Sequence, residues 1–175
     1  MQRSIRNLMI ECIQGDITTQ PDCQAIVNAA NSKLTGGGGV DGAIHRAAGP
    51  ELVEASRALG PIEAGAAVIT PAFKLPNDHV IHCVGPVYNP DQPVAQQLAS
   101  CHVRALQLAA EAGVEQIAFP AISTGVYGYP LEEASRVAMR AVADQADAVG
   151  SITLVRFVLF SERDLRAFNA ALDGV

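Results

Sequence analysis

The sequence contains no block of basic residues, no long apolar run and no closely spaced pair of cysteines. Among its 175 residues, 12 are Lys or Arg and 18 are Asp or Glu, which gives a net charge of −6. This balance argues against electrostatic binding to duplex nucleic acid. No apolar stretch approaches the roughly 20 residues of a membrane span, and the N-terminal residues show no signal-peptide pattern. We therefore expect a cytoplasmic location and no membrane partner.

The cysteine and histidine pattern does not indicate a metal site. Four cysteines occur without a C-x-x-C motif: Cys12, Cys23, Cys83 and Cys101. Three of them lie in or beside apolar runs, which is typical of small buried side chains in a reducing compartment. His82 and Cys83 lie inside the apolar run 80–84, so a core strand explains them better than zinc binding. We predict no bound metal.

Strand-like and helix-like segments alternate along the chain, which predicts α/β layering. The expected strands cover residues 8–13, 25–28, 66–70, 80–84, 116–120 and 152–160. The expected helices cover residues 40–48, 51–59, 94–112 and 131–146, and a last helix starts at Ser161 as its N-cap, with Asp164 three residues on. The chain has no repeat, low-complexity segment or linker, so we expect residues 1–175 to form a single domain.

Four consecutive glycines, residues 36–39, connect a short apolar run to the start of a helix. Glycines permit positive φ and let backbone N–H groups approach a ligand closely. A helix start adds unpaired N–H groups and the positive end of the helix dipole. This order predicts a pocket for an anion, in particular a phosphate. The loop lacks the Gly-Lys-Ser/Thr ending of a nucleotide triphosphatase loop and the spacing of a dinucleotide-binding fingerprint.

A carboxylate, Asp41, lies at the mouth of the same helix, where an anion should bind. One interpretation is that Asp41 caps the helix. The other is that it takes part in chemistry or contacts a sugar hydroxyl, and the dense glycine run beside two asparagines favours this second interpretation. His45 follows one helical turn later, and it either pairs with Asp41 or is a structural histidine.

Ligands of open α/β sheets bind at the carboxyl ends of the strands, and polar or glycine-rich residues follow several of the expected strands. Asp16 follows the first strand, either as a turn residue or as an acceptor for an exocyclic amine. Phe160 ends the last strand, either stacking on a base or packing in the core. Residues 121–130 form a second glycine-containing loop with hydroxyl groups and an aromatic ring. Two such loops facing each other suit a diphosphate.

Four motifs together resemble a macrodomain, and more narrowly the MacroD-type class that includes bacterial O-acetyl-ADP-ribose deacetylases. They are residues 15–18 (GDIT), 27–31 (VNAAN), the glycine run into 40–45 (VDGAIH), and 123–130 (STGVYGYP). The resemblance extends from about residue 8 to residue 168. It implies a three-layer α/β/α sandwich around a mixed six-stranded sheet, with ADP-ribose lying across the strand ends.

The resemblance also implies roles for individual residues. Asp16 corresponds to the acceptor for the adenine amine, Ile17 to a backbone contact beside it, and Phe160 to an aromatic near adenine. Asn31 corresponds to the residue that contacts the distal ribose, and Asp41 corresponds to the acid implicated in hydrolysis. Asn28 is expected to brace the loop rather than to contact the ligand. The first diphosphate loop comprises Gly37, Gly38, Gly39 and Val40, and the second comprises Ser123, Thr124, Gly125, Val126 and Tyr127, with Tyr127 packing on the distal ribose. No cofactor is implied, and the inserted ligands of zinc-containing macrodomains are absent.

The activity implied by the resemblance is hydrolysis of ADP-ribose esters, either O-acetyl-ADP-ribose or mono-ADP-ribose joined to Asp or Glu side chains of proteins. In one mechanism Asp41 orients or deprotonates water while Asn31 fixes a ribose hydroxyl. In another, the phosphate of the substrate activates the water and Asp41 only positions the ribose. Two other functions stay open: a reader module that binds ADP-ribose without cleaving it, and a phosphatase acting on ADP-ribose 1″-phosphate.

Overall fold

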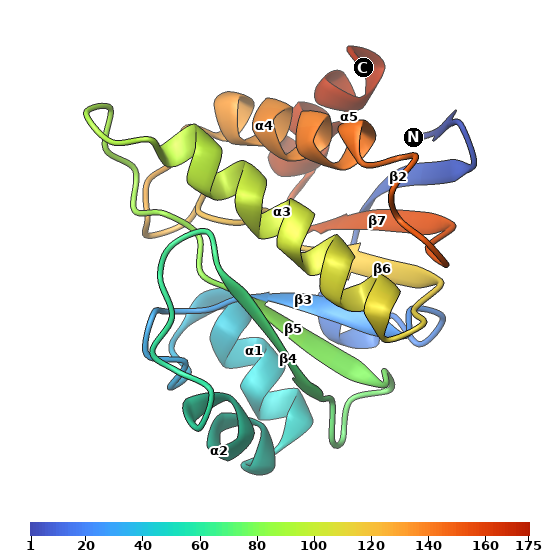
Figure 1. The fold of residues 1–175 in the computed structure, drawn as a ribbon. Helices are drawn as coiled ribbons and strands as arrows, with labels where there is room; N and C mark the ends of the chain where they lie inside the picture. Colours follow the sequence, from blue (N-terminus) through green and yellow to red (C-terminus); the bar gives the residue numbers. More distant parts are fainter.

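The computed structural model describes residues 1–175 and contains a mixed seven-stranded sheet with the order β1-β2-β7-β6-β3-β5-β4 (Figure 1). The five middle strands are parallel, whereas β1 and β4 run antiparallel to their neighbours at the two edges. The strands are β1 (Gln2–Ile5), β2 (Leu8–Gln14), β3 (Ala25–Ala29), β4 (Ala67–Pro71), β5 (His79–Cys83), β6 (Gln116–Phe119) and β7 (Leu154–Leu159).

Helices cover both faces of this sheet, which gives three layers (Figure 1). They are α1 (Gly39–Ala48), α2 (Glu51–Arg57), α3 (Val94–Glu111), α4 (Leu131–Asp144) and α5 (Glu162–Asp173). Successive side chains of β3 point to opposite faces of the sheet and so belong to two separate core clusters. Ile26 packs with α1 and α2, while Val27 packs with α3, α4 and α5. The predicted three-layer α/β/α sandwich is therefore confirmed. No helix combines the length and the apolar character that crossing a membrane requires.

The sheet has one strand more than the six that the resemblance implied. The additional strand is β1, which pairs with β2 through a tight turn in which Arg6 has φ 55°. Its first three residues are exposed and its sequence, QRSI, has no apolar alternation, so the pattern gave no strand prediction there. The short 3-10 helix η1 (Ile17–Thr19) was also not predicted.

The remaining predicted elements are present, with ends that differ by a few residues. Ser161 is the N-cap of α5, as predicted: its Oγ accepts a hydrogen bond from the backbone N–H of Asp164 at 3.1 Å. Because the five middle strands are parallel, their carboxyl ends meet at one edge of the sheet. The loops that follow β2, β3, β5, β6 and β7 therefore gather at that edge.

Candidate functional site

The loop between β3 and α1 and the loop between β6 and α4 form the walls of one cavity of about 430 Å³. Gly36 and Gly39 have φ of 80° and 58°, so the glycine run does adopt the positive φ that its sequence permits. Gly38 is the N-cap of α1, and no side chain occupies the capping position. The first turn of α1 is therefore open towards the cavity. The residues lining it are Ala29, Ala30, Asn31, Gly37, Gly38, Gly39, Val40, Asp41, Gly85, Ala121, Ile122, Ser123, Gly125, Val126 and Tyr127.

Asp41 lies in the first turn of α1 with only 6% of its surface exposed. Its Oδ1 accepts a hydrogen bond from Nδ2 of Asn28 at 2.8 Å and lies 3.2 Å from Nε2 of His45. Oδ2 makes no hydrogen bond and faces the glycine loop, since a Cβ atom on Gly37 would lie 3.3 Å from it. One carboxylate oxygen is thus anchored and the other is free beside the cavity. Of the two interpretations of His45, pairing with Asp41 is the one that the geometry supports.

Asn31 uses its side chain to close the first loop. Its Nδ2 donates to the carbonyl of Gly36 at 2.8 Å, and its Oδ1 accepts from the N–H of Thr35 at 3.3 Å. Nδ2 keeps one further hydrogen and lies close to Gly37, on the cavity side. Asn31 therefore holds the loop and still offers a donor to the cavity. The family resemblance implied only a ribose contact for Asn31, and it implied that Asn28 braces the loop.

The second loop depends on a close approach between Ser123 and Gly85. Ser123 has φ 69°, which is unusual for a residue other than glycine, and its buried Oγ has no hydrogen-bond partner. A Cβ atom on Gly85 would overlap with the Ser123 hydroxyl and would lie 2.5 Å from Cγ2 of Ile122. Only glycine fits at position 85. No role was predicted for Gly85 from the sequence, although Gly-Pro directly after a strand was a visible signal.

The remaining residues of the second loop separate into lining and supporting groups. Tyr127 lines the cavity and is partly buried, and Val126 is fully exposed at its rim. Thr124 does not line the cavity, because its hydroxyl donates to the carbonyl of Ala121 at 3.0 Å and tightens the turn. Ala29, Ala30, Ala121 and Ile122 line it without having been predicted, and their small or apolar side chains carry no chemical signal.

Asp16, Ile17 and Phe160 lie outside this cavity, at the ends of the neighbouring strands β2 and β7. Asp16 Oδ1 accepts from the N–H and the hydroxyl of Thr18, at 2.8 and 2.6 Å, and the hydroxyl bond lowers the pKa of the carboxyl group. Asp16 is therefore a turn residue whose Oδ2 is still free. The Ile17 side chain is buried in the core, which leaves only its backbone for a ligand. Phe160 is 87% exposed, so the alternative that it packs in the core is wrong.

No group of three or more His, Cys, Asp or Glu side chains is arranged to hold a metal ion. His82 is fully buried in β5 and belongs to the core strand, as the sequence indicated. All four cysteines are buried free thiols.

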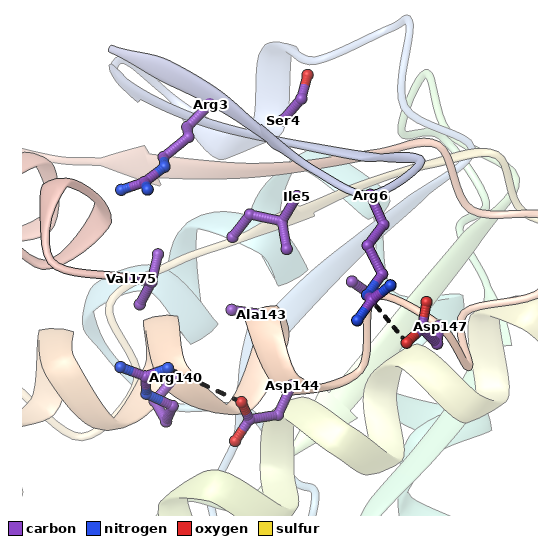
Figure 2. A pocket seen from close by; sticks show the side chains of 10 residues that line it. Arg3, Ser4, Ile5, Arg6, Arg140, Ala143, Asp144, Asp147 and Val175 are labelled. Carbon is purple, nitrogen blue, oxygen red and sulfur yellow. Dashed lines mark ion pairs between the residues drawn. The ribbon is translucent and has the colours of Figure 1, made fainter.

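A second hollow of about 480 Å³ lies between the β1–β2 hairpin, α4 and the C-terminal residue (Figure 2). Its three arginines already have partners. Arg3 donates to the carbonyls of Leu172 and Asp173, while Arg6 and Arg140 pair with acidic residues at 3.0 and 4.0 Å, as the dashed lines in Figure 2 mark. No buried side-chain polar atom around this hollow lacks a hydrogen bond. Unlike the strand-end cavity, it is lined by no glycine and by no residue of a helix start.

Comparison with known proteins agrees with this arrangement of loops and strand ends. The family described as "Macro domain" matches residues 27–138, which include both loops of the cavity and Asp41. The chain belongs to the macrodomain family. A macro domain-containing protein of Chlorobaculum tepidum is 50% identical over 167 residues, covering 95% of this chain and 96% of that protein.

Three further relatives carry more informative names, and two of them are solved structures. A Klebsiella pneumoniae protein named O-acetyl-ADP-ribose deacetylase is 50% identical over 167 residues, covering 93% of this macrodomain and 95% of the relative. A solved Oceanobacillus iheyensis macrodomain with ADP superposes with a TM-score of 0.93 at 41% identity, over 99% of this chain and 95% of that one. A Trypanosoma brucei macrodomain in complex with ADP-ribose gives a TM-score of 0.86 at 36% identity, over 93% of this chain and 68% of that one.

Proposed function

We propose that this macrodomain binds ADP-ribose across its strand ends and hydrolyses esters of ADP-ribose. The observation that carries the proposal is the position of Asp41, buried at a helix start with one carboxylate oxygen anchored and the other free beside a cavity walled by two loops. The names of the Klebsiella pneumoniae relative and of the solved structures with ADP and ADP-ribose support the ligand class. The substrates are O-acetyl-ADP-ribose and mono-ADP-ribose esterified to Asp or Glu side chains of proteins.

The order of the strand ends supports one orientation of the ligand. Asp16 and Phe160 lie at the ends of β2 and β7, and the cavity lies at the ends of β6, β3 and β5. In this orientation adenine lies against the exposed Phe160 ring, with its amine donating to the free Oδ2 of Asp16. The diphosphate lies between the loops 37–40 and 123–127, where backbone N–H groups and the start of α1 stabilise negative charge. The distal ribose then reaches Asn31, Tyr127 and Asp41.

The reaction requires a water molecule and a general base. Asp41 Oδ2 accepts a proton as the water oxygen attacks the ester carbonyl, forming a tetrahedral intermediate. The intermediate collapses with cleavage of the bond between the acyl carbon and the ribose oxygen, and the proton passes to that oxygen. The products are ADP-ribose and acetate, or ADP-ribose and a free Asp or Glu side chain. Asn31 contributes a donor to a ribose hydroxyl, which keeps the ester next to Oδ2.

The diphosphate affects this chemistry through its charge. The negative charge of the diphosphate repels the neighbouring Asp41 carboxylate, which works against binding. The benefit of Asp41 therefore belongs to the transition state rather than to the complex with ADP-ribose. We also propose a cytoplasmic location, because four buried free thiols suit a reducing compartment.

Calorimetric titration with ADP-ribose followed by product analysis tests the proposal. We expect micromolar affinity, about 8 kcal/mol, and release of ADP-ribose and acetate from O-acetyl-ADP-ribose. Binding without turnover of either ester would favour a reader module, and release of inorganic phosphate from ADP-ribose 1″-phosphate with intact esters would favour the phosphatase. No heat with ADP-ribose at millimolar concentration would overturn the ligand assignment.

A further inference from the structure

A row of buried polar side chains extends behind Asp41, from α1 across β3 and β5 to β4. Asn28 and His82 are fully buried, and Thr70 is 4% exposed. Asn28 Nδ2 lies 2.8 Å from Asp41 Oδ1 and 3.3 Å from His82 Nδ1, and His82 Nε2 lies 3.0 Å from Thr70 Oγ1. Asn28, His82 and Thr70 do not line the cavity. Their side-chain hydrogen bonds reach the site through Asp41.

The chemistry of these groups fixes the direction of each hydrogen bond. A carboxylate only accepts, so the Asn28 atom facing Asp41 must be the amide nitrogen. The second hydrogen of that nitrogen points to His82 Nδ1, which must then be unprotonated. His82 consequently carries its proton on Nε2 and donates to Thr70, whose own hydroxyl donates to the carbonyl of Pro71 at 3.0 Å. Burial, reinforced by the neighbouring His45, lowers the pKa of the His82 imidazole to about 4, which keeps it neutral near pH 7.

The sheet register brings these groups together. Asn28 of β3 and His82 of β5 are direct partners in the parallel ladder, so their side chains lie on the same face. That face is the one covered by α1, which carries Asp41. The edge strand β4 adds Thr70 next to His82. Residues that are far apart in the sequence thereby form one continuous chain of hydrogen bonds.

Only the hydrogen bonds of Nδ2 fix the orientation of the Asn28 amide, because its Oδ1 is buried without any hydrogen-bond partner. Rotation of the amide by half a turn would place that oxygen against the Asp41 carboxylate and would remove both bonds from Nδ2. With His82 as second acceptor, the rotation costs two hydrogen bonds. Without it, only the bond to Asp41 opposes rotation, and the carboxylate loses a fixed donor whenever the amide turns.

We propose that His82 is a positioning residue for Asp41: its unprotonated Nδ1 holds the Asn28 amide, which anchors Oδ1 of Asp41 and keeps Oδ2 facing the cavity. This inference rests on the proposed role of Asp41 as general base. It assigns a function to a histidine that would otherwise be only a buried core residue.

Three variants separate positioning from packing. His82→Leu removes the acceptor at similar volume, whereas His82→Asn keeps an acceptor oxygen at the position of Nδ1. His102→Leu is the matched control, because His102 is the other fully buried histidine and lies on α3, bonded to the carbonyl of Leu98. We expect His82→Leu to lower kcat about 10- to 100-fold with KM and ADP-ribose affinity unchanged, since misplacement by about 1 Å costs up to about 10²-fold. His82→Asn should recover most of that rate, and His102→Leu should keep it.

A double-mutant cycle and a tautomer measurement complete the test. If His82 acts through Asp41, His82→Leu should cause no further loss of rate in an Asp41→Ala background. Imidazole nitrogen shifts of the wild type at pH 7 should show a single Nε2–H tautomer. Full activity of His82→Leu, additive losses in the cycle, or an Nδ1–H tautomer would each overturn the positioning role. A wild-type protein that hydrolyses no ester would instead overturn the proposed function, while the tautomer still reports on the hydrogen-bond chain.

Discussion

Replacing Asp41 separates catalysis from binding, and two substitutions are needed because Asp41 also holds buried groups. Asp41→Ala removes the acceptor for the Asn28 N–H and for His45 Nε2. Asp41→Asn keeps one oxygen that can accept from Asn28 but cannot take a proton from water at neutral pH. Comparing the two distinguishes loss of the base from loss of the hydrogen bonds around it.

The structure sets the expected size of each effect. Loss of a general base lowers kcat by about 10²–10⁴-fold, so both variants should lose ester hydrolysis to that extent. Affinity for ADP-ribose should change by less than about tenfold, or ~1.4 kcal/mol, because a carboxylate beside a diphosphate adds little to binding. Asp41→Ala also leaves a buried Asn28 N–H unpaired, which costs about 1–3 kcal/mol of stability. Its Tm should fall by roughly 2–4 °C per kcal/mol, whereas Asp41→Asn should lose less.

Single-turnover hydrolysis of O-acetyl-ADP-ribose, calorimetry with ADP-ribose and thermal melts measure the three quantities on the same preparations. Normal hydrolysis by Asp41→Asn, with its Tm unchanged, would refute the base and leave only the alternative in which the substrate's own phosphate activates water. Normal hydrolysis by Asp41→Ala would remove Asp41 from the reaction altogether. Loss of binding in both variants would show that Asp41 acts on the ground state.

Three further perturbations test other parts of the site. Asp16→Ala should weaken ADP-ribose binding. Because the Thr18 hydroxyl lowers the Asp16 pKa, the contribution of this carboxylate to binding, measured by calorimetry, should be constant from about pH 8 to pH 5. It should be lost only in stronger acid. Gly85→Ala should displace the Ser123 hydroxyl and weaken ADP-ribose binding by tenfold or more (about 1.4 kcal/mol), whereas Gly174→Ala, where a Cβ atom meets only ordinary contacts, should bind normally. Hydrolysis should persist after exhaustive dialysis against EDTA; loss of activity restored by one defined divalent ion would contradict the prediction of a metal-independent site.

Several features of this macrodomain follow from short stretches of sequence. The glycine run, the helix start beside Asp41 and the N-cap at Ser161 are local, since they depend on backbone conformations and hydrogen bonds within a few residues. Apolar runs, apolar helical stripes and Gly or Pro stops likewise predicted the five inner strands, the edge strand β4 and the five helices. The edge strand β1 was missed because an exposed strand buries no face, so its sequence carries no periodic signal.

The tertiary structure decided everything that depends on which strands become neighbours. Only the order β3-β5-β4 and its register place Asn28 against His82, and His82 against Thr70. The same long-range packing makes Gly85 indispensable beside Ser123 and turns Phe160 outward at the end of β7. Such contacts join residues 12 to 54 positions apart, and no local pattern encodes them, because strand pairing is selected by the burial of the whole sheet between its helices.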